Sequence, residues 1–284
     1  MKFRILLAAI VLTATASFGQ ATASPAPAQG TPATPPASAS HQPQAKNDKE
    51  YAAYKLAVSK TDPAQLEAAA DEFAQSFPDS ELKGLLYVRV MQMYQTQNNS
   101  SKVVATGRKA IALNPTDPVP LVAVASALVL DTRENDLDRD SRYAEAAKDA
   151  QAALDNMDTG LQIPPSVTPE QVAAAKANLR SISYDTLGVI AMNKKDYGAA
   201  EQSFQKATEL MKDQPDAVVY LRLSVAQDNE GKYPQALDSA NKAVQYAQEG
   251  SAEKNLAKQQ QARLQKLIAE KNPAAAPAAA TPPH

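Results

Sequence analysis

Few residues in this sequence have the types and spacing that metal or enzymatic chemistry needs. The most suggestive group is Asp136, Asp138 and Asp140, which alternate as the first, third and fifth oxygen ligands of a calcium loop do. The sixth place of such a loop would be Ser141 where a glycine is needed, and the twelfth would be Ala147 where a glutamate is needed. Nearby arginines also compete for the carboxylates. We therefore expect a solvated polar turn here and no metal site.

Catalytic residues are equally scarce. The chain has no Cys, and its only histidines, His41 and His284, lie in segments rich in Pro and Ala. This excludes thiol catalysis and disulfides, and it argues against a histidine-based triad or a zinc site. Paired carboxylates such as Asp71 and Glu72 are better explained as the wet face of a helix, and no phosphate-binding glycine loop or nucleophile motif is present. We expect a non-catalytic protein that uses no cofactor.

Charge and composition narrow the class of protein. The 284 residues include 29 Lys and Arg against 31 Asp and Glu, which gives a formal net charge of −2. This balance argues against a nucleic-acid partner, because nucleic-acid binding usually needs a basic patch. Alanine is abundant, glycine occurs 9 times and tryptophan is absent. Such a composition favours helices that pack through small and aliphatic side chains.

The N-terminus has the pattern of an export signal. In residues 1–23, Lys2 and Arg4 precede an apolar stretch of about a dozen residues, which is too short to span a bilayer. Small residues follow, and Ala21–Ala23 fits an A-x-A cleavage site. Cleavage there would leave no stable membrane anchor. We expect a periplasmic or secreted protein.

Two segments rich in Pro and Ala flank the part of the chain that we expect to fold. Residues 24–46 and 273–284 have little apolar surface to bury, so they cannot offset the entropy of ordering. We interpret them as a disordered linker and a disordered tail. The helical repeat domain is predicted over 47–272.

Self-similarity with a period of 36 residues marks that domain. When the chain is shifted by 36 residues, nine of the 24 positions from Tyr184 to Ala207 are identical. Within a unit, Tyr184, Leu187 and Ala191 share one helical face, and a polar turn follows them. Each unit therefore predicts two helices joined by a short turn. The identical pairs are Tyr184/Tyr220, Leu187/Leu223, Val189/Val225, Asn193/Asn229, Tyr197/Tyr233, Ala200/Ala236, Ser203/Ser239, Lys206/Lys242 and Ala207/Ala243.

These residues resemble the tetratricopeptide repeat. Leu187-Gly188 matches the Leu-Gly of the family's first helix, and Ala200, Phe204 and Ala207 match the second helix, whereas Tyr184 replaces the usual Trp. The resemblance extends over about 47–249 and is weakest before residue 80. It implies an all-α fold, a right-handed α-solenoid of about five helical hairpins. A thin apolar stripe of Leu256, Leu264 and Leu267 predicts a C-terminal capping helix over 252–272.

Capping residues place several helix ends. Asp62-Pro63 predicts a cap followed by the first residue of a helix, and Thr168-Pro169-Glu170-Gln171 predicts a capping box that opens a helix over 169–194. Gly231 predicts the end of one helix, and Gly250-Ser251 predicts the end of one helix and the cap of the next.

The resemblance also implies where a partner would bind, because the family's first helices line a concave groove. Members that clamp an acidic C-terminus need Lys and Asn where this chain has Asp185 and Val189, so such a clamp is not expected. The repeated Asn193 and Asn229 suit a peptide backbone, or they simply cap their own helices. The implied contact residues are Arg89, Gln92, Asp185, Val189, Met192, Asn193, Leu221, Arg222, Val225 and Asn229, with Val88, Gln95, Val122, Ser126 and Val129 at further groove positions.

The sequence is therefore interpreted as an exported, non-catalytic scaffold that binds a protein or peptide through its concave groove in the cell envelope. The alternative is a glycan-binding or enzyme-accessory envelope protein that uses the convex face or the polar insertion near 131–142.

The export signal gives a direct prediction. N-terminal sequencing of the mature protein, isolated from its native host, should find a start between Gln20 and Ser24. An intact Met1 on that protein would contradict the signal-peptide interpretation.

Overall fold

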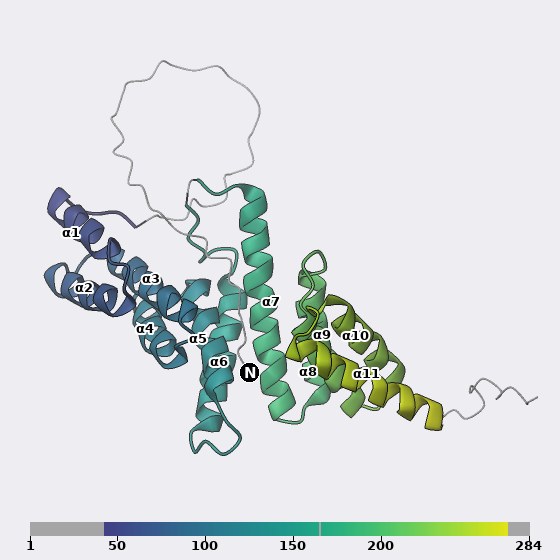
Figure 1. The fold of residues 1–284 in the computed structure, drawn as a ribbon. Helices are drawn as coiled ribbons and strands as arrows, with labels where there is room; N and C mark the ends of the chain where they lie inside the picture. The colour runs from purple at the N-terminus through teal and green to yellow at the C-terminus, as the bar shows by residue number, and fades with distance from the viewer. Residues whose placement is uncertain (1–42, 165, 272–284) are drawn as a thin grey trace, which may run out of the picture. The chain divides into compact units, whose positions relative to one another are not determined.

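The computed structural model describes residues 43–164 and 166–271, and over these residues it is built from helices alone (Figure 1). The predicted signal peptide and C-terminal tail lie outside the described residues. None of the described helices is both long and apolar enough to cross a membrane. The helices are α1 (Asp48–Val58), α2 (Pro63–Ser76), α3 (Leu82–Thr96), α4 (Ser100–Leu113), α5 (Pro118–Asp131), α6 (Arg139–Asn156), α7 (Pro169–Asn193), α8 (Tyr197–Leu210), α9 (Ala217–Asn229), α10 (Tyr233–Tyr246) and α11 (Ala252–Lys271).

The chain forms two compact units. The N-terminal unit comprises the described residues up to Pro120 together with Asn156–Val172, and the C-terminal unit comprises Leu121–Asp155 together with the chain from Ala173 onward. Helices that follow one another along the chain pack against each other, as α2, α3 and α4 do in the first unit and α8 to α11 do in the second. The predicted all-α, tetratricopeptide-like solenoid fold is confirmed.

Helix ends follow the predicted caps closely. The side chain of Asp62 accepts a hydrogen bond from Gln65 N at 2.9 Å, directly before Pro63 opens α2. The capping box at α7 is reciprocal: Thr168 N donates to Gln171 Oε1 at 3.0 Å, and Gln171 N donates to Thr168 Oγ1 at 3.3 Å. Ser251 caps α11 by accepting from Lys254 N at 3.1 Å. Local side-chain chemistry thus sets where these helices begin.

The core of the C-terminal unit depends on small residues where helices meet. Ala200, Ala207 and Phe204 of α8 are completely or almost completely buried. Gly188 of α7 faces the Phe204 ring so closely that a Cβ atom there would lie 2.5 Å from a ring carbon. Glycine in the Leu-Gly motif therefore makes room for the aromatic ring of the next helix. Ala236 of α10 is equally buried in the following repeat.

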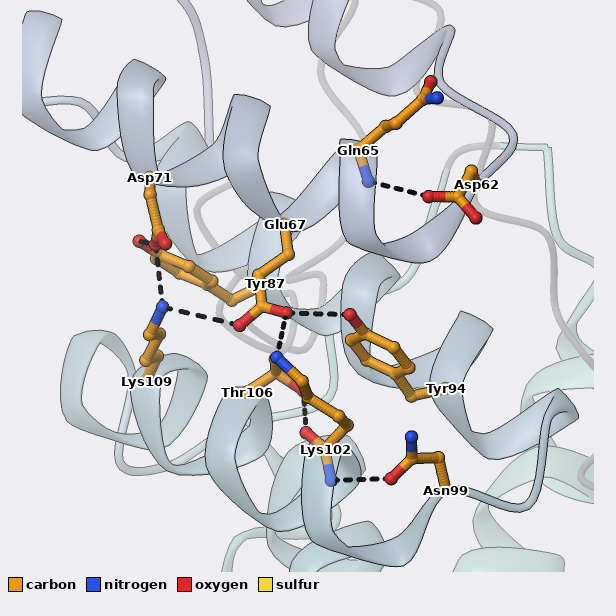
Figure 2. A network of polar contacts seen from close by, with 10 residues as sticks. All are labelled: Asp62, Gln65, Glu67, Asp71, Tyr87, Tyr94, Asn99, Lys102, Thr106 and Lys109. Carbon is orange, nitrogen blue, oxygen red and sulfur yellow. Dashed lines mark hydrogen bonds and ion pairs between the residues drawn. The ribbon is translucent and has the colours of Figure 1, made fainter.

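A ladder of polar contacts joins α2, α3 and α4 in the N-terminal unit (Figure 2). In its first rung, the Tyr87 hydroxyl donates to Asp71 Oδ1 at 2.7 Å, and Lys109 Nζ donates to the same oxygen at 2.7 Å. Burial and the neighbouring Asp71 carboxylate raise the pKa of Tyr87 well above its ordinary value. Asp71, expected only to face solvent, instead connects two other helices.

The second rung repeats this arrangement two turns further along α3. The Tyr94 hydroxyl and Lys102 Nζ both donate to Glu67 Oε2 at 2.8 Å (Figure 2). Burial acts to raise the pKa of Glu67, but the hydrogen bonds from Lys102 and Tyr94 outweigh it and lower that pKa. The seven-residue spacing of the tyrosines and of the lysines matches two helical turns, so one face of each helix carries both rungs.

The residues that α11 buries differ from the apolar stripe that the sequence predicted for this capping helix. Leu264 is completely buried and Ala257 is nearly so, whereas Leu256 is exposed over 38% of its surface. Lys254, Ala257 and Leu264 follow the i, i+3, i+10 positions of one face, and Leu256 lies beside that face. The prediction of Leu256 as part of the stripe was wrong, because the small Ala257 forms the close contact.

The buried alanines lead to a stability prediction. Ala200→Leu should overpack the contact of α8 with its neighbours and lower the free energy of unfolding by about 1–3 kcal/mol. Ala200→Glu should cost more, since it also buries a charge. Denaturant unfolding of both variants measures these changes.

The matched control is Ala262→Leu on the exposed side of α11, which should change stability by less than about 0.5 kcal/mol. Wild-type stability of Ala200→Glu would show that Ala200 does not lie at a tight crossing.

Candidate partner-binding surface

The predicted contact residues of α7 and α9 come together in the C-terminal unit. Val189 and Met192 of α7 and Leu221 of α9 are partly buried and pack against the core formed by α8, α9 and their neighbours. Val225 is also partly exposed, one helical turn beyond Leu221 on α9. We call these four apolar side chains the α7–α9 strip. Its members keep some surface open to solvent after their own repeats have packed.

An ion pair crosses from α7 to α9 beside the strip. Arg222 Nη1 donates to Asp185 Oδ2, and both side chains are only about one-fifth exposed. The second carboxylate oxygen, Asp185 Oδ1, is buried without a hydrogen-bond partner. Burial raises the pKa of Asp185, and the Arg222 charge opposes that rise. Both residues were expected to contact a partner, yet each holds the other, so neither offers an open charge.

Asn193 and Asn229 occupy equivalent places at the ends of α7 and α9. Asn193 Nδ2 donates to Val189 O at 2.8 Å, and Asn229 Nδ2 donates to Val225 O at 2.8 Å. Both asparagines are exposed. Their amide nitrogens thus satisfy backbone carbonyls of their own helices, which is the second of the two roles expected for them. Each amide keeps its second N–H and its oxygen for contact with a peptide backbone.

The other predicted contact residues are divided between the two units. Arg89 and Gln92 lie on α3 in the N-terminal unit and are partly buried, and Arg89 Nε is buried without a hydrogen-bond partner. Val122 and Val129 of α5 were expected to line an open groove, but they are 1% and 8% exposed. Helix α5 is apolar on all sides, so its groove face cannot be told from its core face by pattern.

A buried polar network between α8, α9 and α10 has no counterpart in the sequence-based predictions. Glu201 Oε2 accepts from Lys232 Nζ at 2.5 Å, and Glu201 Oε1 accepts from Gln227 Nε2 at 3.0 Å. Gln227 Oε1 in turn accepts from Ser239 Oγ at 2.7 Å. Burial acts to raise the pKa of Glu201, but the hydrogen bonds from Lys232 and Gln227 together with the Lys232 charge lower that pKa overall. The network joins α8, α9 and α10, and Val189, Met192 and Leu221 of the strip pack against the core to which α8 and α9 contribute.

A second missed feature repeats along the chain. In three repeats, a lysine on the second helix lies over a tyrosine 22 residues earlier on the first helix. The identities Tyr184/Tyr220 and Lys206/Lys242 at the 36-residue shift are the signal that would have revealed this pairing. The nitrogen-to-ring distances are 5.1 Å for Lys109 over Tyr87, 5.1 Å for Lys206 over Tyr184 and 5.4 Å for Lys242 over Tyr220. Such contacts stabilise the hairpins, since an ammonium is attracted to a ring face.

The polar insertion between α5 and α6 is organised by its arginines. Asp138 Oδ2 accepts from Arg142 Nε at 2.7 Å, and Asp140 Oδ1 accepts from Arg139 Nε at 3.2 Å. Asp136 Oδ2 accepts from Arg133 N at 2.8 Å. Each of the three alternating carboxylates has its own partner in the turn, and the loop does not gather them around a common centre.

Of the comparisons with known proteins, the one with solved structures finds similar chains. No protein-family model matches the sequence, and no curated protein matches it. Among solved structures, the Cut9–Hcn1 hetero-tetramer of the APC/C is 17% identical over 73% of this chain and 35% of that chain, with a TM-score of 0.50. PilF of Pseudomonas aeruginosa is 16% identical over 79% of this chain and 92% of that chain, with a TM-score of 0.48. A thermophilic TPR protein of Thermus thermophilus is 13% identical over 77% of this chain and 98% of that chain, with a TM-score of 0.41. At these identities the likeness concerns the tetratricopeptide-like solenoid fold alone.

Proposed function

We propose that this protein is an exported, non-catalytic scaffold that binds an apolar segment of a protein partner on the α7–α9 strip. The observation that carries the proposal is the set of four apolar side chains that remain partly exposed where α7 and α9 meet. Apolar side chains left open on neighbouring helices are a common docking place for peptides, whether extended or helical.

The charges around the strip favour an apolar ligand over an acidic or basic one. Asp185 and Arg222 neutralise each other at close range, so the surface beside the strip carries no net charge from this pair. A charged peptide would have to break an internal ion pair whose members are about four-fifths buried, which is costly. Specificity would therefore come from the shape of the apolar contacts, with Asn193 and Asn229 at the edge.

Export forms the other part of the proposal. It rests on the pattern of residues 1–23, in which a short positive region, an apolar stretch and small residues follow one another. A scaffold of this kind would meet its partner in the periplasm or outside the cell. The search for that partner therefore begins with a crosslinking pull-down from envelope extract.

The α7–α9 strip gives a prediction about affinity. Leu221→Ala should weaken binding of the captured partner by at least about 1 kcal/mol, because a central bulky contact carries a large share of the binding energy. Titration of the purified partner onto each variant measures the change, and circular dichroism confirms that the variant folds.

The control must lie on a different face of the same repeat. Lys206 is unsuitable, since its ammonium lies over the Tyr184 ring, but Gln202 of α8 is exposed and Gln202→Ala should leave affinity unchanged. Arg222→Ala should lower the free energy of unfolding by more than it lowers the free energy of binding, because it leaves the buried Asp185 carboxylate without its partner. If Gln202→Ala abolishes binding and Leu221→Ala does not, the partner does not use the strip.

A further inference from the structure

A small cavity lies within the N-terminal unit, whereas the α7–α9 strip belongs to the C-terminal unit. It has a volume of about 290 Å³ and lies between the start of α3, the end of α4 and the loops beside them. Ligand pockets for whole small molecules usually span roughly 300–1,000 Å³, so this cavity suits a single side chain better than a larger ligand.

A buried carboxylate lines this cavity. Asp117 caps α5, and its Oδ1 atom accepts a hydrogen bond from Val119 N at 3.0 Å. The residue is only 6% exposed. Among the described residues, no neighbouring charge shifts the pKa of the Asp117 carboxyl, whose environment consists of its burial and the Val119 hydrogen bond. Burial raises the pKa of Asp117 to about 6, against the lowering effect of the Val119 hydrogen bond.

The burial of Asp117 comes from a close approach of two loops. A Cβ atom on Gly160 would lie 1.8 Å from Thr116 O, so only glycine lets the 156–164 loop press against the backbone next to Asp117. Gln162 from that loop lines the cavity. The loop thus helps to shield most of Asp117 from water, and no opposite charge in the described part of the chain balances the carboxylate, which is unfavourable for the folded protein alone.

The other lining residues combine negative charge with apolar surface. Asp79 and Glu81 are acidic, and the one basic lining residue, Lys83, donates its Nζ to the Pro78 carbonyl. Leu85, Val88 and Leu113 provide aliphatic walls. A ligand that matches this lining has an aliphatic stem and a positive end.

We propose that the cavity binds the side chain of a lysine presented by a protein partner, with its ammonium group at Asp117 and its aliphatic stem against Leu85, Val88 and Leu113. Lysine fits better than arginine because Val119 N already occupies one acceptor site of Asp117 Oδ1, which favours a compact point charge over a guanidinium that needs both oxygens in its plane. This inference does not depend on the proposed function of the strip, because every lining residue belongs to the N-terminal unit.

The test uses the full chain and small probes of matched shape. Nα-acetyl-lysine methylamide is titrated and followed by two-dimensional ¹H–¹⁵N NMR, alongside Nα-acetyl-norleucine methylamide, which has the stem without the charge, and the corresponding arginine compound. We expect saturable shifts of the Gly84 and Val119 amide signals with the lysine probe. Its binding should be at least about tenfold tighter than that of the norleucine probe, since a hydrogen bond to a charged group is among the strongest.

Two variants and one control connect the binding to the cavity. Asp117→Asn should weaken the lysine probe at least about tenfold and keep the fold, because Asn caps helices as well as Asp. Gly84→Leu keeps every charge but should fill the cavity, since a Cβ at this position already lies 3.9 Å from Leu113 Cβ. The control is Asp216→Asn, which changes the exposed cap of α9, where Asp216 accepts from Val218 N at 2.7 Å in the same geometry. It should bind the probe as the wild type does.

Several results would overturn the inference. Equal binding of the norleucine probe, unchanged lysine binding in both Asp117→Asn and Gly84→Leu, or the absence of saturable shifts would remove the lysine site. Tighter binding of the arginine probe would refute the choice of lysine. Should Asp117→Asn fail to fold, Gly84→Leu still decides the question, because it leaves the cap of α5 intact.

Discussion

The close approach of paired helices is the constraint on which the rest of this structure depends. Two helices can come near each other only where their facing side chains are small, and here Gly188, Ala200 and Ala236 occupy such places. The ring of Phe204 then fills the space that Gly188 leaves open. In the following repeat the equivalent places hold Ser224 and Ala240, and there the buried Ala236 and Ala240 form the close contact instead.

Polar contacts join neighbouring helices in addition to the close contacts between small residues. The Tyr–carboxylate–Lys ladder joins α2, α3 and α4, and the Glu201 network joins α8, α9 and α10. Exposed ion pairs alone contribute little to stability, but several hydrogen bonds shared by one partly buried carboxylate fix the relative rotation of the helices.

Much of the fold follows from short-range patterns in the sequence. The 36-residue repeat, the capping box at Thr168 and the cap at Asp62 each depend on residues within a few helical turns, so they could be predicted. The exposure of Leu256 and the burial of Val122 could not, because they depend on which neighbour covers a helix that is apolar or small on several sides.

The candidate site was less predictable than the fold, for a related reason. The family resemblance indicated the face of α7 and α9, and the structure brings Val189, Met192 and Leu221 together there. The pairing of the charges on that face could not be predicted. Asp185 and Arg222 are 37 residues apart on two different helices, and the pattern of neither helix alone indicates that they form an ion pair. The contact residues therefore remain a prediction, and the apolar members carry it.

Among the described residues, the charges are paired beside the α7–α9 strip and unpaired in the cavity at Asp117. This difference affects which ligands each surface can bind. On the α7–α9 face, the arginine and carboxylate satisfy each other, so the fold gains an internal contact and the surface keeps only shape. At Asp117 the cap of α5 needs an acceptor for the Val119 N–H, which asparagine would supply without any buried charge. Folding therefore accounts for a polar cap at this position and not for its ionisable group. A carboxylate that helix capping does not require, placed in a cavity with aliphatic walls, is explained by a cationic ligand better than by the stability of the helices around it.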